Sequence, residues 1–193
     1  MNLSSLAGWL KARWGSNAGE IDDVRMDAST NVLSTISYEH HEIHAGSHYV
    51  YRETHGVAKN QTLDHLIITP GNTRWAHMTI AIENITSSVT VSLYEATTVS
   101  ANGTLQNSKN RNRNVADNNT TLIYETPTVT GVGTLLATWT LGAGKGSSGG
   151  MARDNAEYVL KQGTNYLFRV VEPNIAATVI NIAFDWYEHT DKH

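Results

Sequence analysis

The stretch between residues 179 and 188 constrains the fold of this chain more than any other feature. Its odd-numbered positions are Val, Asn, Ala, Asp and Tyr. Its even-numbered positions carry large apolar side chains, which are Ile180, Ile182, Phe184 and Trp186. Successive side chains of a strand point to opposite faces, so this period of two predicts a strand with one face in a core. The other face is expected to meet water or a neighbouring subunit.

Strand patterns continue backwards along the chain without helical patterns between them. We expect about ten strands, over residues 31–38, 47–54, 63–69, 74–83, 88–95, 120–125, 134–140, 157–160, 165–171 and 178–188. The polar stretch from Asn84 to Ser88 is typical of a hairpin connection between two of them. Many short strands joined by polar loops predict an all-β fold, an antiparallel β-sandwich with a jelly-roll arrangement favoured. The long loops at residues 100–119 and 142–156 are expected to contact other subunits, to be functional or to be disordered.

The first 30 residues have a different pattern. Large apolar side chains recur at helical spacing over residues 2–14, and they are Leu3, Leu6, Trp9, Leu10 and Trp14. An amphipathic helix of about four turns is marginal alone, so it is expected to dock on its own sandwich or on another protein. Residues 15–30 are polar and aperiodic, which is typical of an extended arm. We therefore expect a helix and arm at residues 1–30 and a sandwich domain at residues 31–193.

Composition excludes several classes of function. A chain of 193 residues buries roughly 70% of its unfolded surface, so it can fold without disulfides or metals. It has no cysteine, which excludes thiolate metal sites and cysteine nucleophiles. A net charge of −4 without a basic block argues against nucleic-acid binding. No apolar run approaches the roughly 20 residues of a membrane span, and the N-terminus lacks the pattern of a signal peptide.

The histidine-rich segment at residues 40–48 is the strongest candidate for metal chemistry. On a strand, His40, Glu42 and His44 would share one face, and two imidazoles with a carboxylate can bind a divalent metal. Metal-binding jelly rolls of the cupin type place a glutamate a few residues after a His-x-His pair, with more ligands on a later strand. No clean second half follows here. We therefore interpret the segment as a polar strand end or a subunit contact, and expect no metal or other cofactor.

Signatures of catalysis are weak. Gly144 and Lys145 are adjacent, as in a phosphate-binding loop, but Trp139 stands where that motif needs its first glycine. Gly146 then replaces the Ser or Thr that should follow the lysine. The chain has no Gly-x-Ser-x-Gly elbow, and no pair of carboxylates can be placed on either side of a scissile bond. We expect that the protein is not an enzyme.

Several blocks of the sequence resemble a family of tailed-phage virion proteins. These blocks are residues 40–46, 73–78, 111–114, 153–169 and 185–189, and together they span most of residues 38–190. The resemblance implies a β-sandwich that acts as a head decoration (cement) protein. Such a protein is made in the host cytoplasm and sits on the outside of the major capsid shell of the virion, commonly as a homotrimer. The resemblance carries no catalytic motif.

The N-terminal helix suits this role, because apolar and aromatic anchors concentrate binding energy at interfaces. We expect Leu3, Leu6, Trp9, Leu10 and Trp14 to bind the major capsid protein. One alternative is another virion module, either a tail or fibre part or a carbohydrate-binding receptor module. The chain lacks the repeats of a fibre, and a sugar site would need aromatic residues on an exposed sheet face. A metal-dependent jelly-roll enzyme and a non-viral β-sandwich are the remaining alternatives.

Overall fold

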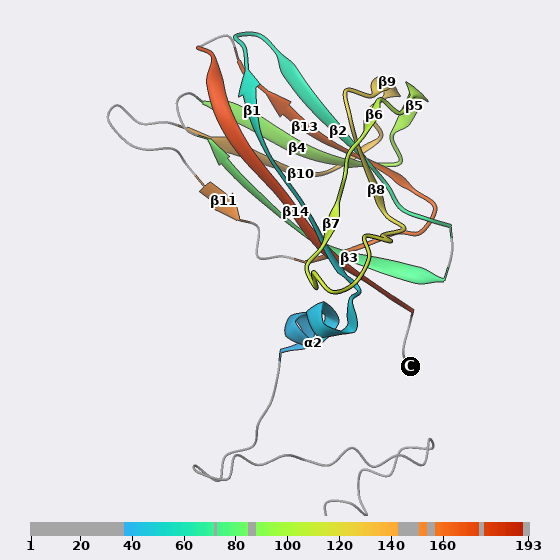
Figure 1. Cartoon of the computed structure of the whole chain (residues 1–193). Coiled ribbons are helices and arrows are strands. Elements are labelled where there is room, and N and C mark those ends of the chain that lie inside the picture. Colours follow the sequence, from blue (N-terminus) through green and yellow to red (C-terminus); the bar gives the residue numbers. More distant parts are fainter. Residues whose placement is uncertain are drawn as a thin grey trace, which may run out of the picture. The chain divides into compact units, whose positions relative to one another are not determined.

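The structure is a computed structural model of an all-β protein. It describes residues 37–71, 73–84, 88–142, 151–153, 157–173 and 176–190, which form two antiparallel sheets packed against each other (Figure 1). The expected antiparallel β-sandwich is therefore confirmed. The expected helix and arm at residues 1–30 lie outside the described residues and stay predictions. Within the described ranges, no helix has the length and hydropathy needed to cross a membrane.

The first sheet has the strand order β11-β3-β14-β1-β7, and β12 pairs with β3 as well. All of its pairs are antiparallel. Its strands are β1 (His48–Val57), β3 (Arg74–Asn84), β7 (Lys109–Asn110), β11 (Met151–Arg153), β12 (Tyr158–Leu160) and β14 (Thr178–Thr190). The long central strand β14 is the one whose alternation stood out in the sequence.

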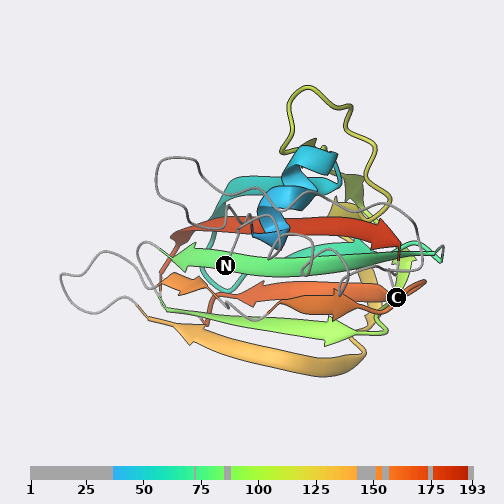
Figure 2. The same ribbon diagram turned by 90° about the horizontal axis from the view of Figure 1, so that it is seen from below.

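The second sheet has the order β10-β4-β13-β2-β8-β6 and stacks on the first as a separate layer (Figure 2). Its strands are β2 (Thr62–Ile68), β4 (Val89–Glu95), β6 (Thr104–Leu105), β8 (Leu122–Glu125), β10 (Thr134–Leu141) and β13 (Asn165–Val171). A small two-stranded sheet consists of β5 (Thr98–Ala101) and β9 (Thr128–Gly131). The expected strands from residue 47 onward match these bounds to within three residues.

The chain alternates between the two large sheets along its main strands. Strands β1, β3 and β14 belong to the first sheet, whereas β2, β4 and β13 belong to the second. The predicted hairpin from Asn84 to Ser88 is therefore wrong, because it joins strands of different sheets. Both β3 and β4 have one apolar face, and crossing between layers lets these faces meet in one core about 10 Å thick.

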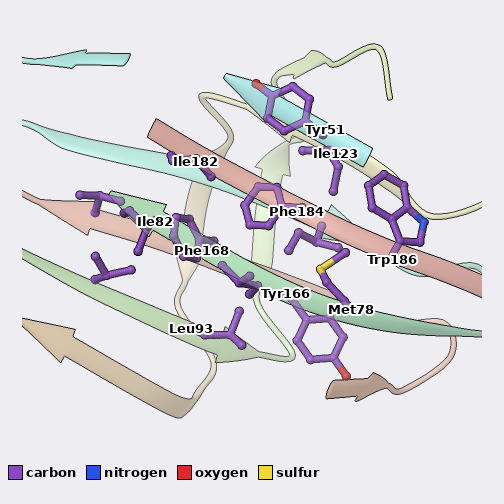
Figure 3. Close-up of a cluster of buried hydrophobic side chains, with 14 of the residues drawn as sticks. Tyr51, Met78, Ile82, Leu93, Ile123, Tyr166, Phe168, Ile182, Phe184 and Trp186 are labelled. Atoms are coloured by element: carbon purple, nitrogen blue, oxygen red, sulfur yellow. The ribbon is translucent and has the colours of Figure 1, made fainter. Parts of the chain in front are cut away.

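The core lies between the two layers and confirms the alternation in β14. Ile180, Ile182, Phe184 and Trp186 are each at most 2% exposed. Phe184 meets Phe168 of β13 edge to face across the layers, with ring centroids 5.2 Å apart (Figure 3). Burying a side chain of this size contributes about 1.5 to 3 kcal/mol, so this row anchors one sheet to the other.

The segment before β1 is a helix, α2 (Tyr38–Ala45), and not a strand. The strand predicted at residues 31–38 is wrong at Tyr38, and residues 31–36 lie outside the described ones. Gly46 ends the helix with a φ of 75°, a left-handed conformation that glycine adopts without strain. The Gly46 amide donates to Ile43 O and the Ser47 amide donates to Glu42 O, each at 3.1 Å. This is a Schellman ending, and it places β1 directly after the helix.

The long loop between β6 and β8 is held by buried polar side chains. Asn110 is 1% exposed, and its side-chain amide donates to Gly46 O at 2.7 Å. The backbone amide of Asn110 donates to Asp117 Oδ1 at 2.7 Å. Further along, the Glu188 carboxylate accepts from the backbone amides of Thr120 and Thr121. This part of the expected 100–119 loop is therefore an ordered element that rests on the ends of β1 and β14.

Candidate functional site

The five residues expected to bind the capsid lie outside the described part of the chain. They are Leu3, Leu6, Trp9, Leu10 and Trp14, and their role as anchors stays a prediction. The candidate surfaces discussed below therefore all belong to the sandwich.

The outer face of the first sheet carries a shallow hollow of about 680 Å³. We call it the outer trough and define it by Arg52, Thr79, Ala81, Asn181, Ala183 and Asp185, which all line it. Ala81 and Ala183 are directly opposed in the ladder between β3 and β14, so two small side chains meet at its centre. Larger polar residues surround these two alanines, so the surface is lower at the alanines while the ladder between β3 and β14 stays continuous.

Polar pairs form the rim of the outer trough. Arg52 Nη2 lies 3.3 Å from Asp185 Oδ2 across β1 and β14. Asn181 joins the two neighbouring strands, because its Nδ2 donates to Glu83 Oε2 at 3.1 Å and its Oδ1 accepts from Thr54 Oγ1 at 2.8 Å. Cross-strand pairs of this kind stiffen the face that they cover. The trough is therefore an open, partly polar surface, a form that suits contact with another surface.

A second group of side chains comes from β3, β14 and the residue before β12. This histidine–tyrosine cluster consists of His77, Glu157, Tyr187 and His189. The rings of His77 and Tyr187 stack with centroids 4.7 Å apart and planes 17° apart. His77 Nε2 lies 2.9 Å from His189 Nε2, and His77 Nδ1 pairs with the Glu157 carboxylate. Because Tyr187 is only 9% exposed and already stacked, it does not offer the free aromatic face that sugar binding requires.

The face predicted for His40, Glu42 and His44 does not exist, because these residues lie on α2. Residues two apart on a helix point to different sides. His40 and His44, four apart, are exposed and have their Nε2 atoms 2.9 Å apart. Glu42 is 2% exposed, and its carboxylate accepts a hydrogen bond from the Ser47 hydroxyl near the start of β1. Glu42 therefore helps to fix the helix to the sandwich, away from the two histidines.

Four titratable side chains that sequence reasoning missed converge at one edge of the sandwich. This edge cluster consists of Glu53 and His55 of β1, His65 of β2 and Glu125 of β8. His65 and Glu125 are directly opposed in the ladder between β2 and β8. Among the described residues, His55, His65 and Glu125 form a group whose ligand atoms all lie within 4.8 Å of one another, so they could hold a metal ion.

Burial shifts the pKa of two members of the edge cluster, His65 and Glu53. Burial, followed by the charge of His55, lowers the pKa of His65 to about 4. Burial, followed by hydrogen bonding and charge repulsion with Glu125, raises the pKa of Glu53 to about 7. His65 is therefore neutral at pH 7, with a lone pair on one ring nitrogen. A sequence signal did exist, since Glu53 and His55 take the inward positions of β1 where alternation calls for apolar residues.

Comparison with known proteins does not assign the chain to a family. No protein-family model matches it, and no curated protein is similar enough to count as a relative.

Proposed function

We propose that this protein is a structural virion protein of a tailed phage, which binds the outside of the major capsid shell as a head decoration protein. The resemblance of five sequence blocks to such proteins supports this function. The structural observation that carries it is the outer trough, an open and partly polar face on the three central strands β3, β14 and β1. A face of this form suits a broad, partly polar contact with another protein surface. On a shell, many copies multiply modest individual contacts.

We also infer that the sandwich is a jelly roll. Counting the main strands in chain order as β1, β2, β3, β4, β10, β12, β13 and β14, the first sheet reads 1-8-3-6. The second sheet reads 2-7-4-5 in the same count. The first strand thus pairs with the last and the second with the seventh, and successive strands mostly alternate between the two layers. This is the strand order of a jelly roll, which consists of two Greek keys. This architecture is common in viral capsid proteins, which agrees with the proposed role.

The exposed leucines of the second sheet support the proposed homotrimer. The edge strand β10 carries Leu135 and Leu136, which are 51% and 42% exposed. The opposite edge strand β6 carries Leu105, which is 55% exposed. A three-fold ring joins two different patches, one from each neighbour. We place the contact between the β10 edge of one protomer and the β6 edge of the next.

A reconstitution experiment tests the proposed function. Heads assembled from the major capsid protein of the same genome are mixed with the purified full-length chain, sedimented and imaged by cryo-electron microscopy. We expect density for the chain at regular positions on the shell. Cosedimentation at background level, or density confined to a tail, would contradict the head decoration role.

Three variants locate the contact. Deletion of residues 1–16 should leave the sandwich folded, as judged by circular dichroism, and abolish head binding. Ala183→Arg should fill the outer trough and weaken binding at least tenfold. Thr140→Arg adds the same side chain on the exposed outer side of β10 and serves as the matched control. Unchanged head binding by both the deletion and Ala183→Arg would show that neither surface is used.

The trimer has its own test. Leu135→Ser combined with Leu136→Ser, and separately Leu105→Ser, should each convert a trimer to a monomer in sedimentation-velocity ultracentrifugation. A chain that is monomeric before substitution, or trimers that persist in both variants, would contradict the placement of the contact.

A further inference from the structure

The edge cluster lies where the two sheets meet beside β1, and its side chains come from both layers. Glu53 and His55 are two apart on β1, so they point to the same side of that strand. His65 and Glu125 come from the second sheet. Strand β7 pairs with β1 at two residues, Tyr49 and Val50. On that side, the remainder of β1 after Val50 has no hydrogen-bonded neighbour strand among the described residues. The cluster thus lies at an open edge of the sandwich, in reach of solvent.

The distances between the polar atoms fit a single metal ion. Glu125 Oε1 lies 3.1 Å from His55 Nε2 and 3.4 Å from His65 Nε2. Glu53 Oε2 lies 3.4 Å from His55 Nε2. Ligand atoms placed tetrahedrally about 2.0 to 2.1 Å from Zn²⁺ are about 3.3 to 3.4 Å apart. These three separations are therefore close to those within a tetrahedral coordination sphere, and the ligand atoms of His55, His65 and Glu125 all lie within 4.8 Å of one another.

The histidines carry an independent sign of a ligand. The His65 side chain is completely buried, and neither Nδ1 nor Nε2 makes a well-directed hydrogen bond. His55 Nε2 is also buried without one, although Glu125 Oε1 lies 3.1 Å from it and 3.4 Å from His65 Nε2. Buried polar groups are almost always satisfied, so three such atoms in one cluster need an explanation. A cation bound to the two Nε2 atoms would satisfy both at once.

Neighbouring groups would hold the ligands in place. The Tyr51 hydroxyl donates to Glu125 Oε1 at 2.5 Å and also contacts the Glu53 carboxylate. A hydroxyl that orients ligating carboxylates is typical of the surroundings of metal sites. Below the cluster, the His65 ring lies edge-on to Phe184, with centroids 5.8 Å apart. The apolar floor limits the ring of His65 to the orientation that faces Glu125.

We propose that the edge cluster is a site for a divalent transition-metal cation of the Zn²⁺ class, held by His55 Nε2, His65 Nε2 and the Glu125 carboxylate, with the Glu53 carboxylate beside His55 as a further ligand group. Two imidazoles and a carboxylate are a ligand set that suits such cations. The ion joins β1 of one sheet to β2 and β8 of the other. Its role is structural, since it clips the two layers together at an edge that backbone hydrogen bonds leave open. The proposal does not depend on the proposed virion role.

Metal titration of the purified full-length chain tests the site. The protein is prepared without a histidine tag, treated with EDTA, dialysed, and titrated with Zn²⁺ and with Co²⁺. We expect one equivalent bound per chain, and a Co²⁺ absorption spectrum of the intensity typical of four coordination. Saturating Zn²⁺ should raise the Tm by about 5 to 10 °C when its concentration is about one hundred times Kd.

Variants distinguish this site from the exposed pair on α2. His55→Gln and Glu125→Gln change partly exposed residues, so folding is expected to survive and is checked by circular dichroism of the metal-free proteins. Both variants should lose at least 90% of the Co²⁺ signal and the rise in Tm. The matched control His40→Gln/His44→Gln removes the other close histidine pair and should keep both. Absence of stoichiometric binding by the wild type, or loss of binding in the control alone, would overturn the proposal.

Discussion

Replacement of Glu188 by glutamine tests how the long loop between β6 and β8 is held to the sandwich. The Glu188 side chain is 2% exposed. Its Oε1 accepts from Thr121 N at 2.7 Å and from Trp186 Nε1 at 3.0 Å. Its Oε2 accepts from the amide and the hydroxyl of Thr120 at 2.9 and 2.5 Å. A carboxylate is needed here because most of these partners can only donate.

The expected cost of Glu188→Gln follows from this geometry. If the amide oxygen takes the place of Oε1, it keeps the 3.0 Å contact with the Thr120 amide. The NH₂ group then replaces Oε2 and cannot accept the 2.9 Å hydrogen bond from that amide. One hydrogen bond to a charged group is lost, at about 1.5 to 3 kcal/mol, and the retained ones lose their charge assistance. Relief from burying a charge offsets part of this loss. We expect a decrease of about 2 to 3 kcal/mol in the free energy of unfolding.

Urea unfolding followed by tryptophan fluorescence measures this decrease, with an unchanged m-value as the sign that the comparison is valid. Glu83→Gln on the neighbouring strand β3 is the matched control, because Glu83 is exposed and should change stability by less than about 0.5 kcal/mol. The reasoning is refuted if Glu188→Gln is as stable as this control.

Three further substitutions test other parts of the structure. Gly46→Ala should lower the free energy of unfolding, measured in urea, by about 1 to 2 kcal/mol. Gly46 has a φ of 75°, and an added Cβ would lie 3.0 Å from the Val115 side chain. An unchanged stability would contradict the proposed role of Gly46 in ending the helix. Phe184→Ala should lower stability by about 3 to 5 kcal/mol, and a loss below 1 kcal/mol would contradict its central place in the core. Burial, followed by the charge of Arg111, lowers the pKa of His48 below its usual 6.5, so the unfolded chain binds this proton more readily. The contribution of His48 to the free energy of unfolding should therefore be largest above pH 6.5 and decrease below it. When stability is measured as a function of pH, His48→Gln should show a smaller decrease at low pH than the wild type. Equal decreases in both proteins would contradict a lowered pKa at His48.

The local pattern of β14 was sufficient to predict a strand and its buried face. Alternation survives in any antiparallel sandwich, because each strand must place its apolar side towards the one core. The same argument located β13 and β3. It did not locate the two-residue strands β6 and β7, whose hydrogen bonds depend on strands that are distant in sequence.

Two errors show where local reasoning ends. The short polar connection after Asn84 fits a hairpin as well as a crossing between layers, and only the pairing of β3 with β14 decided between them. The segment from Tyr38 to Ala45 carries little apolar patterning of either period. Its helix depends on the Gly46 ending and on the burial of Glu42 against the start of β1, which are tertiary features.

The sequence by itself determined the fold class, most strand positions and the core row of β14, because each depends on side chains close together in the chain. The functional proposal also came from the sequence, through the resemblance to virion proteins that we infer from five of its blocks. Tertiary structure alone decided which sheet each strand joins, and it brought His55, His65 and Glu125 within 4.8 Å of one another. These three residues come from three strands in two layers, so no local pattern could join them. A site made across layers becomes visible only when the layers are stacked.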